Sequence, residues 1–122
     1  MRVACLYDVH ANLPALEAVL ADVREARADR VVFGGDVLPG PMPRECLDLM
    51  DSLDIPAEFI IGNGDRETAA AASGTMSAVI PEFFRDAMRW NAAQLTPRDF
   101  EVIGAWPLTI QMAIECLEVL RS

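Results

Sequence analysis

The sequence contains no lysine and only one histidine, His10, among its 122 residues. All ten basic side chains are therefore arginines. The absence of lysine excludes a Walker-type phosphate-binding loop, catalysis through a lysine Schiff base, and a receiver domain that needs a lysine beside its phospho-acceptor.

Long hydrophobic runs and excess positive charge are also missing. No apolar run approaches the ~18 residues that a membrane span needs, and the apolar stretch between Arg2 and Asp8 is too short for a signal peptide. The net charge of −9 opposes binding to a nucleic-acid backbone. A hydrophobic share of 52% excludes a disordered chain. We therefore expect a single cytoplasmic domain over residues 1–122, with no membrane or nucleic-acid partner.

Cysteine is scarce, and the three thiols form no CxxC pair. Cys5, Cys46 and Cys116 lie far apart in an apolar-rich chain. This usage is typical of reduced, buried thiols in a cytosolic protein.

The first half of the chain alternates strand and helix signals. Short apolar runs predict strands at residues 3–7, 31–33 and 58–61, the first of them buried on both faces. Apolar periodicity predicts helices after the capping residue Asn12, over residues 13–23, and over residues 46–53. This order predicts an α/β fold with a parallel sheet whose strand carboxyl ends meet at one edge.

The second half is expected to be mostly helical. Helical signals cover residues 81–95 and continue after the capping residue Thr96. Residues 108–112 alternate and predict a strand, whereas residues 113–122 are ambiguous.

Metal-binding residue types follow each of the three predicted strands. Asp8 and His10 follow the first strand, Asp36 the second and Asn63 the third, one strand–helix unit apart. Asp, His and Asn are hard and borderline donors for divalent cations, and a central Asp36 could bridge two ions. Two such ions clamp a phosphoryl group and lower the pKa of a bridging water. Each loop alone is commonly a turn or a helix cap, so the prediction depends on the ordered set.

The ordered set resembles a known family. Asp8-x-His10-x-Asn12, Gly35-Asp36 and Gly62-Asn63-x-Asp65 are similar to the motifs of the calcineurin-like metallophosphoesterases. More narrowly, the chain resembles the small bacterial and archaeal phosphodiesterase branch, over about residues 1–112.

The resemblance implies a fold, a metal centre and an activity. The fold would be an αββα sandwich, of which this chain carries the N-terminal portion. Asp8 and His10 would hold the first ion, Asp36 would bridge both, and Asn63 would hold the second; the ions would be Mn, Fe, Zn or Ni. The reaction would be hydrolysis of a small phosphoric ester by metal-bound hydroxide.

Three neighbouring residues have alternative roles. Asn12 either contacts the phosphate or caps the following helix, and the cap is favoured. Arg66 either binds phosphate oxygens or is a solvated residue at a helix start. Asp65 would be mainly structural.

The chain also departs from the family pattern. Gly64 stands where many members have a histidine that protonates the leaving group, and no histidine follows His10. We therefore expect the second metal site to be weak. Residues 113–122 do not continue into the expected strand and histidine motifs, so we expect a truncated, frame-shifted or shortened copy. The DNA beyond codon 122 would test this.

The leading hypothesis is thus a metal-dependent hydrolase of phosphoric esters. The alternative is an inactive metallophosphoesterase-like remnant that serves as a binding or interaction domain. An unrelated nucleotide-binding domain is disfavoured because the first loop lacks Gly-x-Gly-x-x-Gly. An incomplete sandwich exposes apolar surface, so association into homo-oligomers is also expected.

Overall fold

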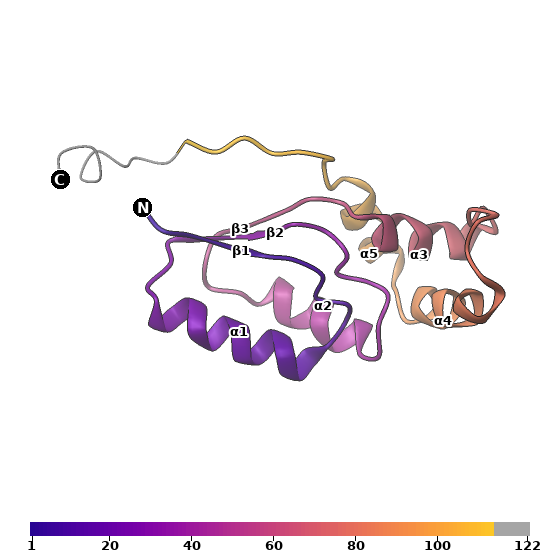
Figure 1. The fold of residues 1–122 in the computed structure, drawn as a ribbon, viewed down its shortest axis with the longest axis horizontal. Coiled ribbons are helices and arrows are strands. Elements are labelled where there is room, and N and C mark those ends of the chain that lie inside the picture. The colour runs from indigo at the N-terminus through magenta and orange to yellow at the C-terminus, as the bar shows by residue number, and fades with distance from the viewer. Residues whose placement is uncertain (114–122) are drawn as a thin grey trace.

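In the computed structural model, three parallel strands form a sheet with helices on one face and beyond one edge (Figure 1). The structure describes residues 1–113, so the ambiguous end of the chain and Cys116 lie outside the described residues. The elements, in chain order, are β1 (Val3–Leu6), α1 (Leu13–Glu25), β2 (Arg30–Phe33), α2 (Pro43–Asp51), β3 (Ala57–Phe59), α3 (Asn63–Ser73), α4 (Glu82–Ala93) and α5 (Pro97–Gly104). In this part of the chain, none of the helices has the length and apolar character that crossing a membrane requires.

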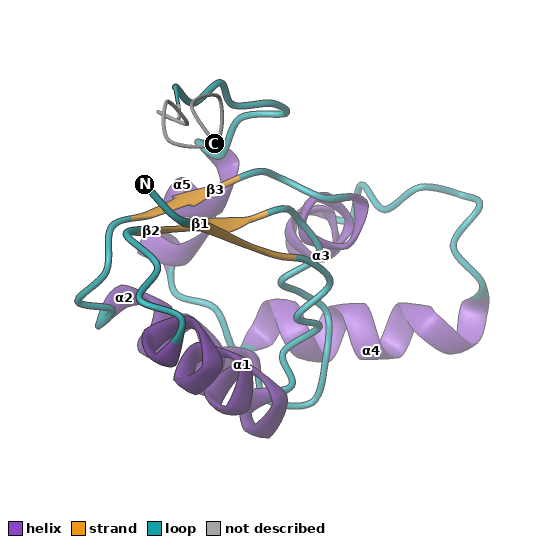
Figure 2. Cartoon of the chain, turned by 60° about the vertical axis from the view of Figure 1, so that its left-hand side comes forward, coloured by secondary structure: helices purple, strands orange, loops and turns teal. Residues whose placement is uncertain are grey.

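The sheet has the order β1-β2-β3, and every pair is parallel. Leu6 pairs with Phe33, which pairs with Phe59, so these three side chains point to the same face. Helices α1 and α2 lie along this face (Figures 1 and 2). The register therefore places the main core between the sheet and these two helices.

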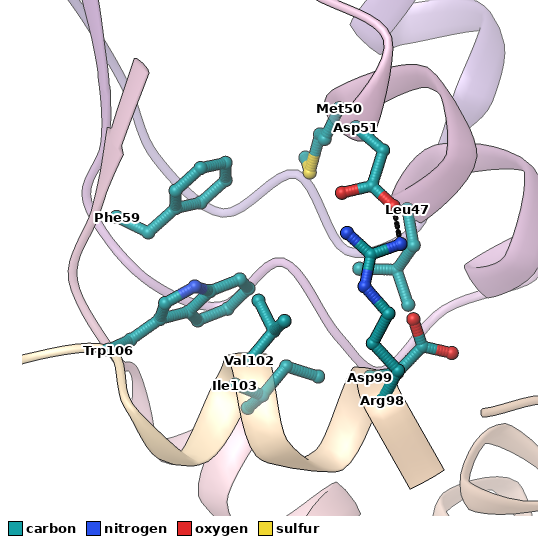
Figure 3. Close-up of a pocket in the computed structure, with 9 residues that line it drawn as sticks. All are labelled: Leu47, Met50, Asp51, Phe59, Arg98, Asp99, Val102, Ile103 and Trp106. Carbon is teal, nitrogen blue, oxygen red and sulfur yellow. Dashed lines mark ion pairs between the residues drawn. The ribbon is translucent and has the colours of Figure 1, made fainter. Parts of the chain in front are cut away.

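An aromatic stack extends the core to α5. The rings of Phe33 and Phe59 lie 4.9 Å apart, and Trp106 stacks on Phe59 at 4.8 Å. Figure 3 shows Phe59 and Trp106 beside a small cavity between α2 and α5. Its volume of about 60 Å³ is far below that of a typical ligand pocket, so it is a packing space rather than a binding site.

In the described part of the chain, no segment covers the other face of the sheet at β1. Cys5 is exposed, as is 63% of Tyr7 in the loop after β1. The expectations that residues 3–7 are buried on both faces and that Cys5 is a buried thiol are therefore wrong. Cys46, on the core side of α2, is fully buried as predicted. Burial raises the pKa of its thiol to about 11.

Two other elements differ from the prediction. Residues 108–112 form no strand. The chain instead leaves α5 in an extended path (Figure 1), and the Ile61 N–H donates a hydrogen bond to the carbonyl of Pro107. Helix α3 is not among the helices that apolar periodicity predicts, because its first residues have turn-like chemistry and its C-terminal half is a run of alanines. Only the alternative role of Arg66 at a helix start pointed to a helix here. Its N-terminus places Asn63 at the edge of the sheet.

Candidate metal centre

Three loops meet beyond the carboxyl ends of the strands, as the parallel topology predicts. Ligand atoms of Asp8, His10 and Asp36 all lie within 4.8 Å of one another. The backbone joins the loops: the Asp8 N–H donates to the Gly35 carbonyl, and the His10 N–H donates to the Asp36 carbonyl. The structure therefore brings together three of the four predicted metal ligands in one cluster.

The backbone at this cluster adopts conformations that L-residues rarely use. Asp8, His10, Ala11 and Asp36 have φ angles of 54°, 45°, 49° and 56°. Each such residue costs roughly 1 kcal/mol, and such conformations concentrate at functional sites. Four of the five positive-φ residues other than glycine in the described chain lie here. The fold thus maintains backbone strain where the cluster forms.

The ring of His10 has a defined orientation. Its Nδ1 lies 3.0 Å from the backbone carbonyl oxygen of Pro39. A carbonyl can only accept, so Nδ1 must carry the proton and donate it. This leaves the lone pair of Nε2 available to a cation, which is the arrangement commonly found behind metal-bound histidines.

A backbone hydrogen bond also fixes the carboxylate of Asp36. Its Oδ1 accepts a hydrogen bond from the Gly64 N–H at 2.8 Å, which leaves Oδ2 available to a cation. The side chain is half-buried between the first loop and the start of α3. Asp36 therefore keeps one carboxylate oxygen available beside Asp8 and His10.

Asn63 lies on the same cavity wall as His10 and Asp36. Its amide oxygen accepts a hydrogen bond from the Arg66 guanidinium, one helical turn further along α3. Both residues are exposed. The hydrogen bond thus places the Arg66 guanidinium beside Asn63.

Asn12 has a structural use in this fold. Its Oδ1 accepts a hydrogen bond from the Ala15 N–H at 3.1 Å and caps α1. The capping role that the sequence favours is therefore present.

Asp65 is fully buried and accepts three backbone hydrogen bonds. The donors are the N–H groups of Gly62, Asp36 and Leu38, at 2.9, 3.0 and 2.9 Å. Burial raises the pKa of this carboxyl group, although the three donors act against that rise. Asp65 thus fastens the Asp36 loop to the start of α3 and is a structural residue of the site.

The structure adds one positioning residue that the sequence did not indicate. Asn91 on α4 is 98% buried, and its Oδ1 accepts a hydrogen bond from the Gly40 N–H at 3.1 Å. That bond fixes the loop whose Pro39 carbonyl orients His10. The available signal was a polar amide at a position that the apolar pattern of α4 buries.

The donor set fits a divalent cation. Two carboxylates and a neutral imidazole are ligands that Mn, Fe, Zn and Ni accept, and like charges at this spacing favour a cation between them. Asn63 could add a neutral oxygen beside them. The fit is stronger around Asp8, His10 and Asp36 than around Asn63, whose oxygen is already hydrogen-bonded to Arg66.

Comparison with known proteins finds two similar chains. The chain is similar to the crystal structure of a metallophosphoesterase from Sphaerobacter thermophilus, with a TM-score of 0.67 and 36% identity over 88% of this chain and 42% of that one. It is also 26% identical to the uncharacterized protein MJ0912 of Methanocaldococcus jannaschii, over 98% of this chain and 48% of the relative. No model of a known protein family matches the chain.

These similarities confirm the predicted fold class. The parallel sheet with its flanking helices matches the fold of the Sphaerobacter thermophilus metallophosphoesterase. The chain spans less than half the length of either of these proteins.

Proposed function

We propose that this chain belongs to the metallophosphoesterase superfamily, in its small phosphodiesterase branch, and that it hydrolyses phosphoric esters with a divalent metal centre. The observation that carries the proposal is the convergence of Asp8, His10 and Asp36 within 4.8 Å on a strained loop edge. The Sphaerobacter thermophilus structure supports the superfamily.

In this proposal Asp8 and His10 would hold one ion, Asn63 would contribute to a second, and Asp36 would serve both. Divalent ions act as Lewis acids on phosphoryl oxygens and increase the acidity of water. Manganese, iron, zinc and nickel are all compatible with these ligands.

The remaining residues orient this set. The Pro39 carbonyl holds the proton of His10 on Nδ1, and the Gly64 N–H holds Oδ1 of Asp36. Arg66, exposed beside Asn63, can donate two N–H groups to phosphate oxygens. Gly64 carries no side chain that could protonate a leaving group, so an ester with a good leaving group is the better substrate.

A metal titration combined with a hydrolysis assay tests the proposal. Chelator-treated protein is titrated with Mn²⁺ and Zn²⁺ by calorimetry, and hydrolysis of bis(p-nitrophenyl) phosphate and p-nitrophenyl phosphate is then measured. We expect metal binding, metal-dependent turnover, and loss of both by at least tenfold in Asp36→Asn. Asp22→Asn, an exposed carboxylate on α1, is the matched control and should change neither.

A non-catalytic binding domain is the second candidate. The open sheet face with exposed Cys5 and Tyr7 favours it, because an uncovered sheet face can bind a partner or a second copy of the chain. Metal binding without turnover, together with self-association in sedimentation, would support this candidate. Absence of any metal binding would overturn the metallophosphoesterase proposal.

A further inference from the structure

An open cavity of about 370 Å³ adjoins the candidate metal centre. One part of its wall is polar and consists of His10, Asp36 and Asn63. The facing part comes from the segment before α4 and from α4 itself, and consists of Ile80, Phe84 and Met88. The cavity is therefore large enough for a small ligand. Its polar wall suits a charged group of that ligand, and its apolar wall suits an apolar group.

A second hollow of about 510 Å³ continues this apolar surface. It shares Pro39 and Phe84 with the first cavity. Its lining also includes Ala87 and Trp90 of α4. Phe84 and Trp90 are each about half exposed, so the aromatic faces on this side of α4 are accessible to a ligand.

The apolar wall is held firmly beside the metal cluster. Asn91 joins α4 to the Gly40 N–H, and the buried Thr68 hydroxyl lies 3.6 Å from the sulfur of Met88. Met88 lies one helical turn after Phe84 and Asn91 lies two turns after it, so all three are on the same side of α4. Phe84 is thereby presented to the cavity by residues that are themselves fixed.

The charges on the wall indicate what the cavity excludes. Among the described residues that line it there is no arginine, and the acidic ones are Asp36 of the cluster and Glu67. The Glu67 carboxylate accepts a hydrogen bond from the Ser77 N–H at 2.9 Å. A second phosphate or a carboxylate on the substrate would find no cationic partner there.

We propose that this cavity binds the organic group of the substrate, that this group is uncharged and aromatic, and that Phe84 is its main contact. This inference rests on the proposed function, since it needs the phosphoryl group at the metal cluster. Offset stacking on Phe84, with Ile80 and Met88 at the sides, favours a flat ring over an aliphatic or highly polar group. Phe84 is thus a specificity-determining residue rather than a catalytic one.

Binding of non-hydrolysable phosphonates to the Mn²⁺-loaded chain tests this inference without an activity readout. Phenylphosphonate, cyclohexylphosphonate and methylphosphonate are compared by calorimetry. We expect phenylphosphonate to bind about tenfold more tightly than methylphosphonate, with cyclohexylphosphonate between them. In Phe84→Ala the advantage of the phenyl group should be lost, while methylphosphonate affinity stays the same.

Phe83→Ala is the matched control. Phe83 is the neighbouring aromatic residue, 75% exposed, and lines neither hollow. The Phe83 ring lies 4.3 Å from that of Phe84, but Phe83→Ala keeps the Phe84 ring, so this variant should retain a phenyl preference. Phe84→Tyr should restore the preference that Phe84→Ala loses. Equal thermal stability of the two alanine variants shows that both are folded.

The outcomes separate this inference from the proposed function. Metal-dependent binding of all three phosphonates with equal affinity overturns the inference and leaves the proposed function standing. Equal affinity of the phenyl and cyclohexyl compounds overturns the aromatic preference. Failure of every phosphonate to bind the metal-loaded chain overturns both proposals.

Discussion

The buried carboxylate of Asp65 accepts a hydrogen bond from the backbone N–H of Asp36 at 3.0 Å. Asp36 in turn accepts one from the N–H of Gly64, the residue just before Asp65, at 2.8 Å. The two acidic residues thus lock the second and third loops together in both directions. Asp65 is not one of the proposed metal ligands, yet it determines where the proposed ligand Asp36 lies.

Replacing Asp65 with asparagine should loosen this connection. The amide has one carbonyl oxygen, so its NH₂ group would face backbone N–H donors that the carboxylate now satisfies. We expect a loss of about 2–3 kcal/mol in the free energy of unfolding, measured by urea denaturation. We also expect metal affinity to fall about tenfold, since Asp36 loses its support.

The matched control is Asp48→Asn, which changes a carboxylate that is 65% exposed on α2. It should lower stability by less than about 1 kcal/mol and leave metal affinity unchanged. If Asp65→Asn unfolded at the same urea concentration as the unmodified chain, Asp65 would not have the supporting role assigned to it.

Gly64 is a second position on which the site depends, because the backbone there lies very close to the Asp36 loop. A Cβ atom at residue 64 would lie 2.2 Å from the Leu38 carbonyl oxygen and 3.1 Å from Oδ1 of Asp36. Gly64→Ala should therefore displace the Asp36 loop, destabilise the protein by about 1–3 kcal/mol and weaken metal binding. Gly64→His, which introduces the residue found in many metallophosphoesterases, should be at least as disruptive.

Gly104→Ala, at the end of α5, is the comparison for Gly64→Ala, because within the described part of the chain a Cβ atom at residue 104 would meet no atom of another segment within 4 Å. Alanine there should leave metal binding unchanged and raise stability by up to about 1 kcal/mol. Thermal unfolding and Mn²⁺ titration of both variants measure the difference. Similar results for the two glycines would contradict the steric argument.

The location of the site could be predicted because it depends on local signals and parallel topology. Asp8 directly follows one apolar run, and Asp36 follows another after two glycines. These runs become adjacent parallel strands, which end at the same edge. Glycine and polar residues at those ends marked the loops. The convergence of Asp8, His10 and Asp36 required no knowledge of long-range packing.

Other features depend on contacts that no local pattern carries. An apolar strand such as residues 3–7 indicates that burial is favourable, but not which segment covers each face, so the expectation of a buried Cys5 is wrong. Phe84 fits the apolar periodicity of α4 yet is half exposed, because α4 lies at the edge of the site. The bond from the Gly40 N–H to Asn91 spans 51 residues and could not be seen in the sequence.

The ion pair between Arg44 and Asp99 joins α2 to α5. The atoms Nη1 and Oδ2 lie 2.5 Å apart, and the side chains are 30% and 11% exposed. Burial alone would raise the pKa of Asp99, but hydrogen bonds from Arg44 and Thr96 outweigh it and lower that pKa. The pair therefore stabilises the fold while Asp99 is ionised.

Asp99→Asn should lower the free energy of unfolding by about 1–3 kcal/mol at pH 7. Because the folded-state pKa of Asp99 is lowered, its stabilisation is complete above the unfolded value of 3.8 and is lost as the pH falls through the folded value. The difference between the two proteins should thus shrink below about pH 4, as measured by denaturation across the pH range.

Arg98 and Asp51 provide the control for this pair, since they also join α5 to α2 but are 76% and 53% exposed (Figure 3). Asp51→Asn should change stability by less than about 0.5 kcal/mol at any pH in the range. A pH-independent effect of Asp99→Asn would show that the lost stability comes from packing rather than from the ionised carboxylate.

The open face of the sheet makes a last prediction about thiol reactivity. Cys5 is exposed on that face, whereas Cys46 is fully buried and its thiol has a pKa of about 11. The thiolate is the reactive form, so Cys46 is protected both by its surroundings and by its protonation. Iodoacetamide should therefore label Cys5 much faster than Cys46 in the folded protein at pH 8, as followed by mass spectrometry of the two peptides.

In 6 M guanidinium chloride the two rates should become similar, because unfolding removes both forms of protection from Cys46. Slow labelling of Cys5 in the folded protein, at micromolar and at tenfold lower concentration, would mean that the face is covered even when the chain is dilute. Slow labelling that becomes fast on dilution would instead identify a second copy of the chain as the cover.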